Sequence, residues 1–447
     1  MTIPLSTSRR PELAVDDTPS PRSKLRSTIF YGVFALLLLG PLAFGAVQPW
    51  SIFILEAASA LLFILWIVEQ FCSPTSTVRW NSLFSPMLVF ASLVILQLAA
   101  RRTAYPYATF SSGLLYVAYG VICFLVIQCF TRPSQVRILT RSFSSYGFVV
   151  AAFALLQGLG SNNKLYWLLT PRGGGWIYGP YVNHNHYAGL MEMLFPIPLV
   201  FSLTRYARGA PRRLAVLSSA VMATTIFLSG SRGGVIAFVC EIIVLLASLI
   251  RQQSRIPFRG RLAFTVFAVL LISFFAWIGS HKIAERLTSV HSARREITQG
   301  LRVQIDRDLL KMFPHRPLLG WGLGTFADVY PQYRSFYTSF YIDQAHNDYL
   351  QLLIEMGAIG FLTMMWFLWL VFREANRKLR NWSNDIDGAI TLAAMLGVVG
   401  MLVHSLVDFN LQVPANAAIF YVLCVIAAME PRFGRAESAK LEHAAHR

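Results

Sequence analysis

Residues that could act on an anionic substrate lie between apolar stretches of this chain. The run Ser229-Gly230-Ser231-Arg232-Gly233-Gly234 joins two such stretches. Its glycines free the backbone to form a concave group of N–H donors, and a following helix would add its positive N-terminus. The guanidinium of Arg232 can bind phosphate through two N–H groups. The pattern therefore indicates a phosphate or diphosphate site, with a tight interhelical turn as the alternative.

A histidine opens another apolar stretch, in the run Ala345-His346-Asn347-Asp348-Tyr349-Leu350. An imidazole titrates near neutral pH, so His346 could take a proton from a hydroxyl group. The alternative is a structural cap of the following helix, made by His346 or Asn347.

The long polar segment before His346 carries Arg302 within an amphipathic pattern. Leu301, Ile305, Leu309 and Met312 recur at spacings of three and four residues, which predicts a helix with one apolar stripe. We expect this helix to lie flat on the outer face of a bilayer, and an interfacial helix without any chemical role is the alternative.

Other chemical patterns are weaker. The segment Gly320-Trp321-Gly322-Leu323-Gly324 follows no predicted strand, so it is not a dinucleotide-binding fingerprint. Asp306-Arg307-Asp308 and Asp385-Ile386-Asp387 have the carboxylate spacing of some metal-dependent glycosyltransferases, but we interpret both as solvated charges. No cluster has the spacing of zinc ligands. The sequence therefore predicts neither a metal site nor a cofactor.

Composition shows what must position these residues. Of 447 residues, 55% are hydrophobic and only 14% are charged, against roughly 25% charged in soluble proteins. This balance excludes a soluble enzyme, a disordered chain and a secreted disulfide scaffold. The net charge of +17 would suggest nucleic acid in a soluble protein. Here the basic residues lie in short loops, so the expected partner is the lipid bilayer and not nucleic acid.

The apolar stretches are long enough to cross a bilayer, and only helices satisfy their own backbone there. We predict an all-α polytopic membrane protein with about twelve transmembrane helices between residues 29 and 430. The predicted spans are 29–48, 51–71, 82–100, 113–130, 143–160, 185–203, 214–230, 233–250, 262–279, 349–372, 387–409 and 414–430. Residues 1–28 and 431–447 are predicted as cytoplasmic tails, the first of them disordered. Residues of about 280–348 are predicted to form one long outer loop that contains the interfacial helix, periplasmic if the cell has a periplasm.

The positive-inside rule orients these spans. With a cytoplasmic N-terminus, the inside segments hold 25 Lys and Arg and the outside segments hold 14, nine of them in the long loop. Long loops largely escape the rule. Both termini are therefore predicted to be cytoplasmic.

Carboxylates inside the predicted spans support a different class of function. Glu56, Glu192, Glu241 and Asp408 lie within apolar stretches, and intramembrane carboxylates are functional candidates. A transporter or flippase of a lipid-linked glycan would place such groups near the bilayer midplane. The densest polar positions lie at the outer boundary instead, which favours an enzyme. A membrane scaffold would not require Arg232, Arg302 and His346 to converge.

Taken together, the motifs resemble the O-antigen ligase and polymerase superfamily of bacterial membrane glycosyltransferases. The stretches that carry the resemblance are Ser229 to Gly234, the segment from Arg302 to Pro317-Leu318-Leu319-Gly320-Trp321-Gly322-Leu323-Gly324-Thr325-Phe326, His346-Asn347-Asp348-Tyr349-Leu350 with Glu355, Gly357 and Gly360, and Asn183-His184-Asn185-His186-Tyr187-Ala188-Gly189.

The resemblance implies an inner-membrane enzyme that takes a glycan from an undecaprenyl-diphosphate carrier on the periplasmic face. A ligase joins the glycan to an acceptor such as lipid A–core, whereas a polymerase extends O-antigen, capsule or exopolysaccharide; the motifs leave both open. The resemblance also implies that no metal and no nucleotide is needed. His346 matches the essential histidine, a general base, and Arg232 and Arg302 match the essential arginines, which bind the diphosphate. Residues expected to contact the substrates are Asn183, His184, His186, Asn347 and Tyr349.

Overall fold

The computed structural model describes residues 21–72, 78–130, 133–160, 164–171, 176–252, 255–278, 292–338 and 341–429. Over these residues the chain is helical or irregular, without β-strands and with two isolated bridges. The predicted all-α class is confirmed. The predicted C-terminal tail and most of the N-terminal tail lie outside the described residues, but the first helix already begins at Pro21.

Each predicted span overlaps a helix or a pair of helices. These are α1 (Pro21–Leu42), α2 (Pro49–Phe71), α3 (Phe84–Ala99), α4 (Pro106–Cys129), α5 (Pro133–Gly160), α6 (His184–Leu194) with α7 (Pro196–Leu203), α8 (Gly209–Ser229), α9 (Arg232–Arg251), α10 (Phe258–Ile278), α14 (Asp348–Lys378), α15 (Ile386–His404) and α16 (Pro414–Ala428). Within the described ranges, nine helical segments are long and apolar enough to cross a membrane, and α3 and α16 are shorter. The fold is that of a polytopic membrane protein, and the count of twelve stays a prediction.

The central helices of the bundle are buried, and the peripheral helices expose apolar side chains. Helices α6, α7, α15 and α16 pack against one another, and every residue of α16 is buried. Peripheral helices expose large apolar side chains instead, as Phe53, Leu61 and Ile64 do on α2. Contiguous exposed apolar surface of this kind suits a bilayer and not water.

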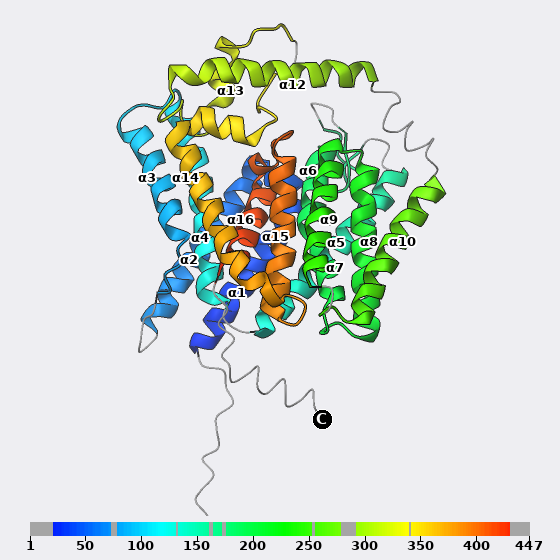
Figure 1. The fold of residues 1–447 in the computed structure, drawn as a ribbon. Coiled ribbons are helices and arrows are strands. Elements are labelled where there is room, and N and C mark those ends of the chain that lie inside the picture. Colours follow the sequence, from blue (N-terminus) through cyan, green and yellow to red (C-terminus); the bar gives the residue numbers. More distant parts are fainter. Residues whose placement is uncertain are drawn as a thin grey trace, which may run out of the picture.

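An outer layer lies across one end of the bundle. Helices α12 (Ser292–Met312) and α13 (Phe326–Val329) cover the end where α14 begins and α15 stops (Figure 1). The predicted helix around Arg302 is therefore present. Its apolar stripe does not face the bilayer, however, because Ile305, Leu309 and Met312 are buried in one cluster with residues of α13 and α14.

Helix α14 is interrupted where the outer layer contacts it. Gly357 has φ +65° and ψ −174°, so the helix breaks there instead of continuing as its sequence pattern suggests. The segment before α13 supplies the missing partners: Ala358 N–H donates to the Pro317 carbonyl at 2.8 Å, and Trp321 N–H donates to the Ile354 carbonyl at 2.9 Å. The hydrogen bonds at this break join the outer layer to α14.

Candidate active site

A buried carboxylate, Asp408, is the centre of a polar cluster at the end of the bundle that α12 covers. Its side chain is 2% exposed, and Nη2 of Arg302 lies 3.6 Å from its Oδ2. Nδ1 of His346 and Nε2 of His186 lie 3.7 Å and 3.9 Å from its Oδ1. Asn185 donates a hydrogen bond from its side-chain amide to Oδ2. We call these five residues the Asp408 cluster.

Four segments that are distant in sequence build this cluster. Asp408 lies in the segment after His404, the last residue of α15. Asn185 and His186 occupy the first turn of α6. That turn is fixed by the N-cap Asn183, whose side-chain oxygen accepts the Asn185 N–H at 2.9 Å. Arg302 comes from α12, and His346 precedes α14.

The ring of His346 is held between Asp408 and solvent. The backbone of His346 has φ +56°, an uncommon conformation for a residue with a side chain. Its ring packs edge-on against Phe409, with 4.8 Å between centroids. Nδ1 is inaccessible and faces Asp408, yet the side chain is 27% exposed, so the other side of the ring is open. Nδ1 lies 3.7 Å from Asp408 and has no hydrogen-bond partner among the described residues. In the tautomer with the proton on Nδ1, Nε2 keeps its lone pair.

The two carboxyl groups beside Arg302 have different electrostatics. Burial by itself would raise the pKa of Asp408, but His346 and the positive charge of Arg302 lower that pKa well below its usual range. Asp408 is therefore ionised at neutral pH. For Asp306 on α12, burial raises the pKa, and the charges of Arg302 and His346 offset only part of that effect.

A second buried pair, a histidine and a glutamate, lies next to the cluster. Nδ1 of His404, in the last turn of α15, lies 3.0 Å and 3.1 Å from the two carboxyl oxygens of Glu192 on α6. Nε2 of the same ring lies 3.4 Å from Oγ of Ser231, the N-cap of α9. A Cβ added at Gly233 would lie 2.6 Å from the His404 ring, so only glycine permits this approach. The pair thus ties the last turn of α6 and the start of α9 to the end of α15.

Arg232 is the first residue of α9 and is exposed. The next residue, Gly233, packs against His404 and Val407, and the carbonyl of Val407 accepts a hydrogen bond from Arg302. The start of α9 and Arg302 therefore meet the same short segment. Part of the predicted anion-binding backbone is used locally, since the Gly234 N–H donates to Oγ of Ser231 at 3.1 Å.

The five predicted substrate-binding residues have different surroundings. His186 belongs to the Asp408 cluster, and the ring of His184 lies 4.4 Å from that of Trp176. Asn183 and Asn347 cap α6 and α14 through their side-chain oxygens. The Tyr349 hydroxyl donates to the Leu402 carbonyl at 2.8 Å. Capping, one of the two interpretations of the Asn347 position, is thus present.

The weaker candidates prove to be structural. The N–H groups of Gly324 and Phe326 donate to the carboxylate of Glu355, at 2.8 Å and 3.2 Å, so the glycine segment fastens α13 to α14. The interpretation of Asp308 as a solvated charge is wrong: it is 1% exposed and accepts hydrogen bonds from Tyr330 and Ser335. Among the described residues, no group of three or more His, Cys, Asp or Glu could hold a metal ion.

Sequence reasoning gave Asp408 the wrong surroundings. The predicted span 387–409 placed this carboxylate inside the membrane, as support for a transporter, whereas α15 ends at His404. A polar pair, Asp408 and Asn410, shortly before the helix-starting Pro414 was the available signal of an earlier helix end.

The fold and the Asp408 cluster define a polytopic helical membrane protein with a polar site at one end of its bundle. Residues 217–365 match the family model described as O-antigen ligase. Over this range, about a third of the chain, the protein resembles the O-antigen ligase superfamily. The matched residues include Arg232, Arg302 and His346, whereas Asp408 and His186 lie outside them. No curated protein matches the chain. The family supports a ligase or polymerase type of function, on lipid-linked glycans, in a membrane.

Proposed function

We propose that this protein transfers a glycan from an undecaprenyl-diphosphate carrier to a hydroxyl group of an acceptor sugar, on lipid A–core or a similar glycolipid. The observation that supports this most strongly is the approach of Arg302 and His346, from separate segments, to 3.6 Å and 3.7 Å from the same buried carboxylate. A base beside a guanidinium, in a partly dry site, suits displacement of an anionic leaving group.

The reaction in this proposal is a single displacement. The acceptor oxygen forms a bond to the anomeric carbon of the glycan while the bond from that carbon to the diphosphate oxygen breaks. Nε2 of His346 takes the hydroxyl proton, and Asp408 stabilises the resulting imidazolium. Arg302 and Arg232 bind the diphosphate as its charge develops. Attack opposite the leaving group inverts the anomeric carbon.

The proposal places this chemistry on the periplasmic face of the bacterial inner membrane, with both termini in the cytoplasm. The count of basic residues in the short loops supports this orientation. Metal and nucleotide have no role in the proposed step.

Purified protein, a polyprenyl-diphosphate-linked glycan and a glycolipid acceptor test the proposal. We expect polyprenyl diphosphate to be released in step with a new glycolipid, and neither product from the His346→Ala variant. If donor alone yields a ladder of longer carrier-linked glycans, the protein is a polymerase. If no glycosidic bond forms under any condition, the proposed transfer is wrong.

Transport of a lipid-linked glycan is the second candidate, because acidic groups lie deep in the bundle. Glu241 on α9 is buried, and neither carboxyl oxygen has a hydrogen-bond partner among the described residues. Glu241→Gln preserves the shape of this side chain. An enzyme built on the Asp408 cluster should keep its transfer rate in this variant, whereas a proton- or ion-coupled transporter should lose translocation of a fluorescent lipid-linked glycan.

A further inference from the structure

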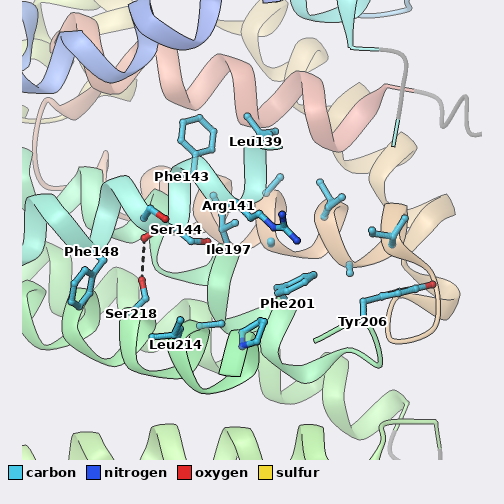
Figure 2. Close-up of a pocket in the computed structure, with 18 of the residues that line it drawn as sticks. Leu139, Arg141, Phe143, Ser144, Phe148, Ile197, Phe201, Tyr206, Leu214 and Ser218 are labelled. Atoms are coloured by element: carbon cyan, nitrogen blue, oxygen red, sulfur yellow. Dashed lines mark hydrogen bonds between the residues drawn. The ribbon is translucent and has the colours of Figure 1, made fainter. Parts of the chain in front are cut away.

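A large apolar cavity lies between α5, α7, α8 and α15, at the end of the bundle opposite to α12. Its volume is about 640 Å³, within the range of roughly 300–1,000 Å³ of pockets that hold small ligands. The close-up in Figure 2 shows Phe143, Phe148, Ile197 and Leu214 around it. The body of the cavity therefore suits a hydrocarbon chain.

A hydrogen bond crosses the cavity wall between two of its helices. The Ser218 hydroxyl donates to the backbone carbonyl of Ser144 at 3.0 Å, drawn as a dashed line in Figure 2. This bond joins α8 to α5 and uses the Ser218 hydroxyl as a donor within the wall. A sugar in the body of the cavity would lose its hydrogen bonds to water there.

One end of the cavity is cationic. Arg141 and Arg208 line it and are exposed, and Figure 2 shows Arg141 and Tyr206 towards the same end, away from Phe148. Arg208 precedes α8, whose first turn has no side-chain cap. Arg212, a turn further on, adds positive charge within electrostatic reach of Arg208.

Two acidic groups next to the cavity make contacts of their own. Ile386 and Ala389 of α15 line the cavity, and Asp385 lies directly before them. Its carboxyl oxygens accept the N–H groups of Asp387 and Gly388 and so cap α15. Lys378 lies within electrostatic reach of Asp387. Arg141 and Arg208 are the charged residues in the cavity lining.

We propose that this cavity binds one anionic glycerophospholipid. The acyl chains occupy the apolar body between α5 and α8, and the headgroup phosphate lies at Arg141 and Arg208. Guanidinium groups bind phosphate as paired donors, and an uncapped helix start favours an anion beside it. With the predicted orientation, this is a lipid of the cytoplasmic leaflet.

The donor lipid of the proposed transfer is a poorer fit. Its diphosphate belongs beside Arg302, at the α12 end, while the cationic end of this cavity lies at the opposite end of the bundle. The inference is therefore independent of the proposed function. It stands or falls with lipid binding and not with glycan transfer.

Native mass spectrometry of the full chain tests the proposal. The protein is exchanged into detergent with equal amounts of phosphatidylglycerol and phosphatidylcholine, and bound lipid is counted. We expect one retained phosphatidylglycerol. The double variant Arg141→Gln with Arg208→Gln should bind it at least about tenfold more weakly, since two charge-assisted contacts are lost.

The matched control is Arg251→Gln with Arg261→Gln, which removes the same charge from exposed positions outside the cavity lining. It should retain the lipid. Ala215→Phe, which fills the cavity, should lose the lipid while keeping both arginines. Arg141→Lys with Arg208→Lys should retain most binding and guards against misfolding of the glutamine variant.

Three results would overturn the proposal. In the first, the Arg251/Arg261 variant loses lipid as strongly as the Arg141/Arg208 variant, which would mean that binding depends on net charge alone. In the second, Ala215→Phe binds phosphatidylglycerol like the unmodified protein. In the third, polyprenyl phosphate displaces phosphatidylglycerol from the unmodified protein and is retained in its place.

Discussion

Arg302 and Val407 are joined by a hydrogen bond of 2.7 Å, from guanidinium Nη1 to the backbone carbonyl oxygen. Nη2 of the same guanidinium lies 3.6 Å from Asp408. One side chain of the outer layer thus contacts both the backbone and the carboxylate of the segment after α15. A displacement of α12 would separate Arg302 from the histidines of the Asp408 cluster.

This double contact makes Arg302→Lys a damaging substitution. An ammonium group is a point charge and cannot reproduce the planar fork that reaches both acceptors. We expect the rate of glycan transfer to fall about 10²-fold or more, as for the loss of one preorganised donor. Arg307→Lys is the control, because Arg307 is exposed on the same helix. Equal activity of both variants in the transfer assay would contradict this role.

His346→Ala should separate chemistry from binding. The loss of a general base typically costs about 10²–10⁴-fold in rate, while binding of lipid-linked donor should change little, because the base acts on the acceptor. Transfer rates and donor binding are measured on the same preparation. His315→Ala, at an exposed histidine of the outer layer, should behave like the unmodified protein. If donor binding falls as much as the rate, His346 holds the donor and is not the base.

Asp408→Asn should lower both activity and thermal stability, since it removes the charge that faces Arg302 and two histidines. The folded-state pKa of Asp408 is depressed, so its stabilising effect is present above the unfolded pKa and is lost as pH falls through the folded one. The melting-temperature difference between the two proteins should therefore persist from about pH 8 to pH 5 and shrink only below about pH 4. A difference that disappears at pH 6 would show that another group is responsible.

Reporter fusions test the orientation. A fusion after about residue 310 should report the periplasm and one after about residue 380 the cytoplasm, as the basic residues of the short loops predict. Reversed signals would place the Asp408 cluster in the wrong compartment for the proposed donor.

Glycan transfer should continue in excess chelator and without added nucleotide. The sequence offers neither a nucleotide-binding loop nor metal-ligand spacing. Activity of the purified protein is compared with and without EDTA. If EDTA abolishes transfer and a divalent ion restores it, Asp306 and Asp308 are candidates for binding that ion, contrary to our interpretation.

Local patterns predicted most of the fold. Apolar runs of sufficient length specify helices whatever surrounds them, and the spacing of Ile305, Leu309 and Met312 is sufficient to predict α12. The surface that this stripe packs against was not predictable in this way, because an apolar stripe has the same sequence pattern whether it packs on lipid or on protein. The expectation of a bilayer surface was therefore wrong although the helix was right.

The cluster shows a similar division. Residue types and motif positions singled out His346, Arg302 and His186. The group that joins them, Asp408, is set by where α15 ends and by which helix starts pack beside that end. The Glu192–His404 pair has the same origin, since its members are 212 positions apart. Contacts of this kind depend on tertiary packing, which no local pattern encodes.

The break at Gly357 has a consequence for how such proteins can be recombined. A Cβ at this position would lie 2.2 Å from the Leu318 carbonyl oxygen, so the backbones of α14 and of residues 317–322 fit only as a matched pair. A chimera that takes its outer layer from one relative and α14 from another would join surfaces that evolved separately. Exchange of both pieces as one block should therefore preserve the fold, and a graft of the loop alone should disrupt it.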